Sequence, residues 1–143
     1  MSDGFDLDRF VRAQAPVMVQ VRRELGAGRK ATHWMWFVFP QLAGLGSSPK
    51  AQDYAISSLD EARAYLAHPV LGHRIVECTH LVNAVEGRTA HDIFGTPDDL
   101  KFHSSMTLFS LADPYEAAFD VALDKYFGGR GDGRTMELLS IEP

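Results

Sequence analysis

The side chains best suited to chemistry in this sequence lie in two stretches that are otherwise strongly apolar. The first, residues 30–41, encloses an aromatic block at residues 34–39 (WMWFVF), and the second is residues 101–105. Polar groups beside so much apolar surface cannot be buried without partners, so we expect the centre of the core to border a polar site. The candidate catalytic acid or base is His33, and the candidate ligand-binding residues are Gln14, Lys30, Trp34, Trp36, Gln41, Lys101, His103, Ser104 and Ser105.

If the two stretches meet in the fold, they form a pocket with tryptophan walls and cationic donors. Such a pocket suits a small anionic ligand that carries a ring, such as a nucleotide or an ADP-ribose derivative. A histidine and a serine could also act as base and nucleophile, although the sequence places no acidic group to orient the histidine. The alternative is that the polar groups satisfy one another in a buried structural network, in a protein-interaction module without catalytic activity.

The sequence indicates neither an enzyme class nor a cofactor, because it has no G-x-S-x-G, H-E-x-x-H, paired-cysteine or Walker motif. His73, Glu77 and His80 share one helical face and could bind zinc. A solvated polar face opposite the core is the favoured interpretation, so we predict no metal site. The loop at residues 42–49 holds two glycines and two serines, but its spacing matches neither a dinucleotide-binding motif nor a P-loop.

Composition limits the classes of protein to which the chain can belong. Its 143 residues, 45% of them hydrophobic and 23% charged, suit one globular domain, predicted for residues 5–140. The formal net charge of −5 argues against a nucleic-acid partner, and the aromatic block is too short to span a membrane. The single cysteine, Cys78, excludes an internal disulfide, and no signal peptide opens the sequence. We therefore expect a soluble, cytoplasmic protein, with its oligomeric state left open.

The spacing of apolar residues and of helix-starting residues predicts an all-α fold, a compact single-domain bundle of about seven or eight short-to-medium helices. The first helix follows Leu7 and restarts at Pro16, and Gln14 on its apolar stripe directs an amide toward the core. The aromatic block fits either a helix ended by Pro40 or a strand buried on both faces. The other predicted helices start near Ser48, Ser58, Val70, Thr89, Thr96, Asp113 and Asp132.

One long string and several short segments of the sequence carry a family resemblance. The string is HWMWFVFPQ at residues 33–41, and the segments are residues 9–10 (RF), 13–14 (AQ), 28–30 (GRK), 44–46 (GLG), 65–66 (YL), 68–69 (HP), 93–95 (IFG), Lys101 and 104–109 (SSMTLF). Together they resemble domain-of-unknown-function family 1810 (DUF1810) over residues 5–139.

The resemblance implies a compact, mostly helical fold and a bacterial, intracellular protein. It brings no established activity, cofactor or catalytic residue. Some members carry an automatic calpastatin label, which denotes a protease inhibitor. Inhibitors of that kind are disordered repeat chains, whereas the composition of this chain is globular.

Overall fold

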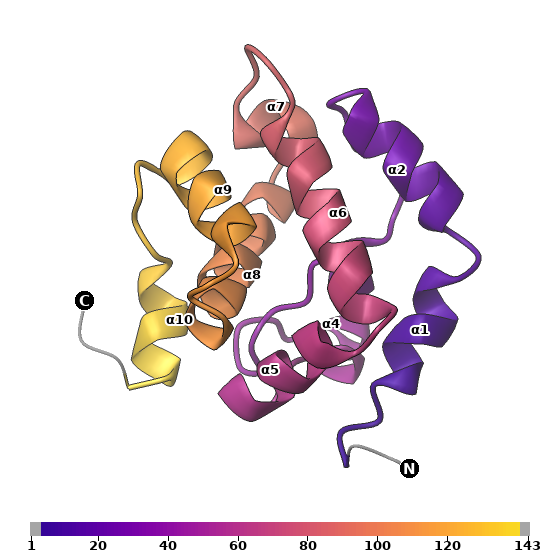
Figure 1. The fold of residues 1–143 in the computed structure, drawn as a ribbon, viewed down its shortest axis with the longest axis vertical. Helices are drawn as coiled ribbons and strands as arrows, with labels where there is room; N and C mark the ends of the chain where they lie inside the picture. Colours follow the sequence, from indigo (N-terminus) through magenta and orange to yellow (C-terminus); the bar gives the residue numbers. More distant parts are fainter. Residues whose placement is uncertain (1–3, 141–143) are drawn as a thin grey trace.

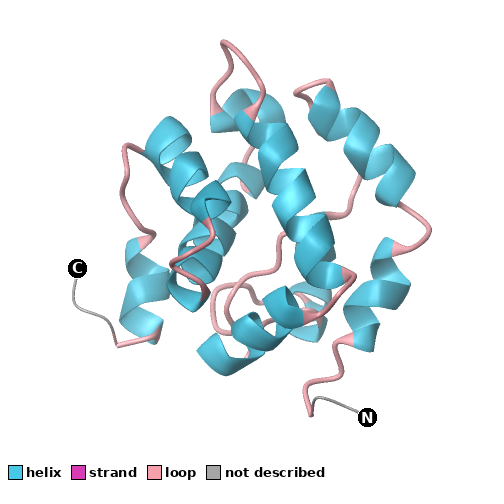
Figure 2. Cartoon of the chain, in the orientation of Figure 1, coloured by secondary structure: helices cyan, strands magenta, loops and turns pink. Residues whose placement is uncertain are grey.

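The computed structural model describes residues 4–140, and within them the chain forms ten helices joined by loops (Figure 1). The all-α prediction is confirmed, with more helices than the sequence indicated. Figure 2 shows only helices and loops along the described chain. Outside these helices, Leu42 and Ile56 form an isolated parallel β-bridge. The helices are α1 (Asp8–Gln14), α2 (Met18–Gly26), α3 (Met35–Val38), α4 (Pro49–Asp53), α5 (Leu59–Ala67), α6 (Leu71–Asn83), α7 (Ala90–Phe94), α8 (Asp98–Ala112), α9 (Ala117–Phe127) and α10 (Gly133–Leu138).

Helix α8 is the central element of the bundle. It packs against α5, α7, α9 and α10, while α6 packs against α2, α5 and α9. Figure 1 shows α6 running between α2 on one side and the α8–α9 pair on the other. Every residue of α8 from Ser104 to Phe109 is buried. A helix with neighbours on several sides keeps no continuous polar face, and this explains why the α8 sequence mixes hydroxyl and apolar side chains.

The amino-terminal helical segment breaks where the sequence predicts a restart. α1 ends at Gln14 and α2 begins at Met18, with Pro16 in the turn between them. Proline inside a continuous helix would remove a backbone hydrogen bond and clash with the preceding turn. Gln14 is buried, as its place on the apolar stripe predicted.

The aromatic block forms a short α-helix of one turn, α3, which ends before Pro40, so the helical alternative holds for the centre of the block and the strand does not. After α3 the chain passes through Pro40 to Leu42, which pairs with Ile56 in the isolated bridge. Trp36 is the partly exposed residue of the block, and the others, Trp34, Met35, Phe37, Val38 and Phe39, are buried. The block therefore joins the core and leaves one indole ring at the surface.

Local capping chemistry explains four of the ten helix starts in the described chain. The predicted caps each accept a hydrogen bond from the backbone amide three residues further on, and they are Ser48, Ser58, Thr89 and Asp132. Such a cap satisfies one of the amide groups that the first helical turn leaves without an intrahelical partner.

The starts of α8 and α9 also differ from the prediction. α8 begins at Asp98, one residue later than expected, because the carbonyl of Pro97 already accepts the first helical hydrogen bonds. α9 begins at Ala117 instead of directly after Asp113, because the Asp113 carboxylate accepts a hydrogen bond from Tyr115 N (3.0 Å) and holds a turn there.

The buried apolar side chains form one continuous cluster, and Cys78 belongs to it. Burial raises the pKa of Cys78 to about 12, so the group is a thiol at neutral pH and fills space in the core. None of the helices between residues 4 and 140 combines the length and the apolar character that a bilayer crossing needs.

Candidate ligand-binding site

The two polar stretches of the sequence meet at Asp98, in the first turn of α8. One carboxylate oxygen of Asp98 lies 2.8 Å from Lys30 Nζ, and the other lies 3.5 Å from Lys101 Nζ. Lys30, whose side chain is only 7% exposed, also donates a hydrogen bond to the carbonyl oxygen of Thr32 (2.6 Å). The two polar stretches therefore meet in the fold, as a shared pocket requires.

Glu24 on α2, which the sequence analysis missed, holds the first stretch in place. Its buried carboxylate accepts hydrogen bonds from Ala31 N (2.7 Å), Thr32 N (3.0 Å) and Trp34 Nε1 (2.9 Å). It also accepts from the side chains of Thr32 (2.6 Å) and Gln20 (2.9 Å). Burial opposes ionisation, but these hydrogen bonds outweigh it and lower the pKa of Glu24 to about 2. Glu24 could have been recognised in the sequence, because it is an acidic residue on the apolar stripe of a helix.

The two tryptophans of the aromatic block have different roles. Trp34 is 1% exposed, and Lys30 Nζ lies 5.1 Å from the centre of its ring, so Trp34 supports the site from within. Trp36 is partly exposed, and Nζ of Lys50 and of Lys101 lie 4.9 Å and 5.4 Å from its ring centre. These distances are within the range of cation–π attraction. Trp36 is thus the ring that a ligand can reach.

Positive charge gathers here although the chain is acidic overall. The sequence contains four lysines, and three of them, Lys30, Lys50 and Lys101, lie over the two tryptophan rings. Asp98 pairs with two of them, whereas Lys50 has no carboxylate within ion-pair distance in the described part of the chain. A local excess of positive charge attracts anions. Sequence reasoning missed Lys50 because it lies on a separate short helix, α4, with no apolar pattern to place it.

A cavity of about 130 Å³ opens beside Trp36. Its walls are the Trp36 ring, α4 and the loop that carries Gly44 and Gly46. This loop is close to α4, since a Cβ added to Gly46 would lie 2.6 Å from Ala51 Cβ. Gln41 lines the cavity, and its side-chain amide makes no hydrogen bond with any residue from 4 to 140. Gln41 therefore offers a free donor and a free acceptor beside the ring.

Gln14 lies elsewhere, in a buried network that joins α1 to the core. Its amide nitrogen donates to the carbonyl oxygen of Phe37 (2.6 Å) and to the hydroxyl of Tyr65 (2.9 Å). Its amide oxygen accepts a hydrogen bond from Arg74 (3.3 Å). Burial raises the pKa of Tyr65, which keeps the phenol protonated at neutral pH. This is the arrangement that a buried structural network requires.

His103 also lies away from the lysines and tryptophans. Residues two apart on a helix point in nearly opposite directions, so with Lys101 over Trp36, His103 faces the other side of α8. Its Nε2 donates to the carbonyl oxygen of Arg130 (2.8 Å), and its ring stacks on Phe127 with 4.0 Å between the ring centres. The role of His103 in the fold is to hold the segment before α10.

The two serines and His33 do not form a nucleophile–base pair. Ser104 donates to the carbonyl oxygen of Leu100 (3.1 Å) within α8. Ser105 is fully buried, and its hydroxyl has no partner in the described chain, for which the structure offers no physical reason. His33 is exposed, and its imidazole makes no hydrogen bond with residues 4–140. A nucleophile and its base must lie within hydrogen-bond reach, so the geometry offers no such pair here.

The polar face of α6 carries His73, Glu77 and His80 along an open hollow of about 360 Å³. Glu77 accepts an ion-paired hydrogen bond from Arg22 of α2 (3.0 Å). Among the residues that the structure describes, no three His, Cys, Asp or Glu side chains are grouped closely enough to hold a metal ion. This face ties α6 to α2 and is otherwise open to solvent.

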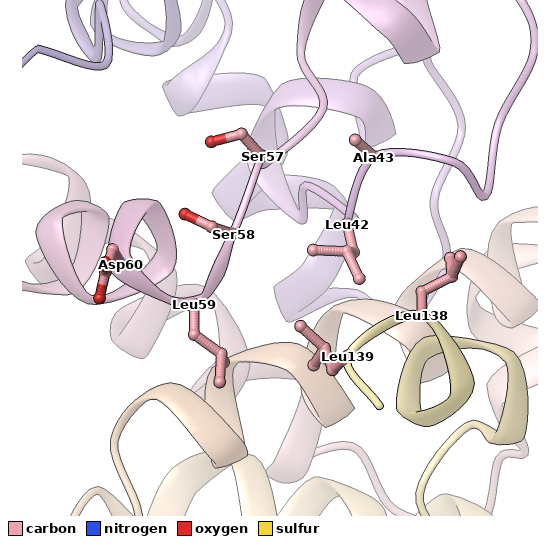
Figure 3. Close-up of a pocket in the computed structure, with 8 residues that line it drawn as sticks. All are labelled: Leu42, Ala43, Ser57, Ser58, Leu59, Asp60, Leu138 and Leu139. Atoms are coloured by element: carbon pink, nitrogen blue, oxygen red, sulfur yellow. The ribbon is translucent and has the colours of Figure 1, made fainter. Parts of the chain in front are cut away.

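A larger hollow of about 450 Å³ lies where α5 begins (Figure 3). Leucine side chains line much of it, and they are Leu42, Leu59, Leu138 and Leu139. The hydroxyl of Ser58 is already used as the α5 cap, and the carboxylate of Asp60 lines the same wall. Leucines and a carboxylate do not suit an anion, so the surroundings of Trp36 are the better candidate site.

Comparison with known proteins identifies relatives but no activity. A family model described as "Protein of unknown function (DUF1810)" matches residues 4–139. The crystal structure of the conserved hypothetical protein Rv1873 from Mycobacterium tuberculosis has 61% sequence identity and a TM-score of 0.95, covering 98% of this chain and 100% of that one. No curated protein matches the chain.

Proposed function

The chain belongs to the DUF1810 family of proteins of unknown function, and from its own geometry we propose that it binds a small anionic ligand that carries a ring. The ring stacks on Trp36, and the ammonium groups of Lys50 and Lys101 hold the anion. The observation that carries this proposal is the gathering of three of the four lysines over two tryptophans in a chain of net charge −5.

The proposed site is smaller than the set of residues that the sequence suggested. It keeps Trp36, Gln41 and Lys101 as ligand contacts and adds Lys50. Lys30 and Trp34 position the site through Asp98 and Glu24, since both are nearly inaccessible. The structural roles of Gln14, His103 and Ser104 place them outside it, and Ser105 is fully buried. Binding is proposed without catalysis, because the His33 imidazole makes no hydrogen bond with a nucleophile among residues 4–140.

A protein-interaction module is the second interpretation, and less supports it. Within residues 4–140 the exposed large apolar side chains come from different elements of the fold, and they are Val19, Leu100, Tyr115, Val121 and Leu138. We also propose that the protein works in a reducing compartment such as the cytoplasm, because its one cysteine is an unpaired, buried thiol.

A thermal-shift panel tests the proposed function. The ligands are nucleotides, dinucleotides and ADP-ribose, with pyrophosphate and uncharged nucleosides as controls that carry only the anion or only the ring. A ligand present at 100 times its dissociation constant adds about 2.7 kcal/mol of stability, which raises the Tm of a chain this long by roughly 5–10 °C. We expect compounds that combine ring and anion to give this shift and either half alone to give less.

Substitutions then locate the bound ligand. Lys50→Ala and Lys101→Ala should each remove most of the shift, because each deletes an ammonium group beside Trp36. Lys125→Ala is the matched control, since Lys125 also lies over an aromatic ring, Tyr126, at 5.5 Å, but on α9. Equal shifts in the Lys101 and Lys125 variants, or no shift with any compound, would contradict the proposed function.

A further inference from the structure

The cavity beside Trp36 limits what kind of ring the ligand can carry. We infer that the site selects a single six-membered ring with a hydrogen-bonding edge, such as a pyrimidine, over a fused purine, and that Gln41 is the residue that reads this edge. This inference rests on the proposed function and names the ligand class for the same site.

The volume of the cavity sets the size of the ring. It measures about 130 Å³, whereas an engineered cavity of roughly 150 Å³ in another protein binds benzene. Sites that enclose whole drug-sized ligands are larger, at about 300–1,000 Å³. The space beside Trp36 therefore holds one ring, and the sugar and anion of a nucleotide would extend out of it toward the lysines.

The walls of the cavity do not expand easily. The loop approaches α4 so closely that even a methyl group on Gly46 would clash with Ala51, at 2.6 Å. Tyr54, which also lines the cavity, packs against the core rings of Phe10 and Phe37, with 5.9 Å and 5.3 Å between ring centres. A bicyclic ring would need one of these walls to move, and a close-packed core resists such movement.

The polar chemistry of the cavity comes from Gln41. The other glutamine in its lining, Gln52, already donates its amide to the carbonyl oxygen of Ser47 (2.8 Å). Gln41 is half-buried and keeps both its N–H donors and its carbonyl acceptor free within the described chain. One amide can pair with a neighbouring donor and acceptor on a ring edge, which pyrimidine bases present. A ring without such an edge would leave the Gln41 amide unsatisfied when it enters.

Isothermal titration calorimetry with matched monophosphates tests the inference. The probes are uridine and cytidine monophosphate, adenosine and guanosine monophosphate, and ribose 5-phosphate, which has the anion and no base. We expect both pyrimidine nucleotides to bind at least about tenfold more tightly than the purine nucleotides and ribose 5-phosphate. Gln41→Leu, which keeps the bulk of the side chain and removes its amide, should weaken pyrimidine binding about tenfold and leave ribose 5-phosphate unchanged.

The results of this experiment distinguish a failure of the inference from a failure of the proposed function on which it rests. Purine nucleotides that bind as tightly as pyrimidine nucleotides would overturn the ring selectivity and leave the proposed function standing. Gln41→Leu binding every probe as the unaltered protein does would overturn the role of Gln41 and also leave the proposed function standing. Failure of all five probes to bind, when Lys101→Ala also changes no thermal shift, would overturn both. The Gln41 side chain makes no hydrogen bond with residues 4–140, so the variant should unfold at the same temperature as the unaltered protein.

Discussion

Replacing Glu24 with glutamine should destabilise the protein strongly, because the Glu24 carboxylate organises the loop that carries Lys30 and Trp34. It accepts five hydrogen bonds, and an amide in its place would direct N–H groups toward donors. Folding lowers the pKa of Glu24 from 4.5 to about 2. Since each tenfold change in acidity corresponds to about 1.4 kcal/mol, the ionised carboxylate contributes about 3 kcal/mol at neutral pH.

The contribution of Glu24 depends on pH with a definite sign. A carboxyl whose pKa is depressed by folding stabilises the native state above its unfolded pKa of 4.5, and this stability is lost as the pH falls toward about 2. The free energy of unfolding should therefore differ by about 3 kcal/mol between the unaltered protein and Glu24→Gln at pH 7, and by less than half of that at pH 3. At neutral pH the Tm should fall by roughly 10 °C.

Urea unfolding followed by circular dichroism at pH 7 and pH 3 measures both quantities. Glu137→Gln is the matched control, because Glu137 is exposed on α10 and its side chain makes no hydrogen bond among the described residues. Its effect should stay within about 0.5 kcal/mol. A loss below 1 kcal/mol for Glu24→Gln at pH 7, or a loss of equal size at both pH values, would refute the role assigned to this carboxylate.

Three further substitutions or modifications test the packing of the fold. Arg9→Ala leaves the carboxylate of Glu61, whose side chain is 3% exposed, without its cation. The free energy of unfolding in urea should therefore fall by about 3–5 kcal/mol. A smaller fall when Glu61→Gln is added to Arg9→Ala would show that the unpaired charge is responsible. Gly72→Ala places a Cβ in a clash with the carbonyl oxygen of Leu66, so the Tm should fall further than in Gly133→Ala, where the added Cβ meets open space. Cys78 should react with a thiol reagent only at the rate of unfolding, since burial raises its pKa to about 12; rapid modification of the native protein would contradict this.

The parts of the fold that depend on neighbouring residues could be predicted from the sequence. Ser58, Thr89 and Asp132 cap their helices with an amide three residues away, and the break at Pro16 follows from the missing N–H of proline. The α9 start was wrong because Asp113 binds a backbone amide and holds a turn before the helix. Side-chain oxygens of this kind serve turns and helix caps equally well, so local sequence cannot distinguish them.

The site depends on contacts between distant segments, so less of it could be predicted. Lys30 and Lys101 were recognised as candidates, but their meeting at Asp98 is set by how α8 packs against the loop before α3. Lys50 was missed because nothing in the pattern of α4 directs it toward Trp36. Ser104 was assigned to a pocket because a polar side chain on an apolar stripe suggests one, whereas its hydroxyl simply bonds within its own helix.

The fluorescence of Trp36 alone tests the central claim most directly. Trp34→Phe leaves Trp36 as the sole tryptophan of the chain and removes one of the hydrogen bonds to Glu24, so circular dichroism first verifies the fold. Titration with the compound that gives the largest thermal shift should change Trp36 emission saturably, and adding Lys101→Ala should raise the dissociation constant at least about tenfold. Emission that stays constant while calorimetry records binding would place the ligand elsewhere and contradict the site at Trp36.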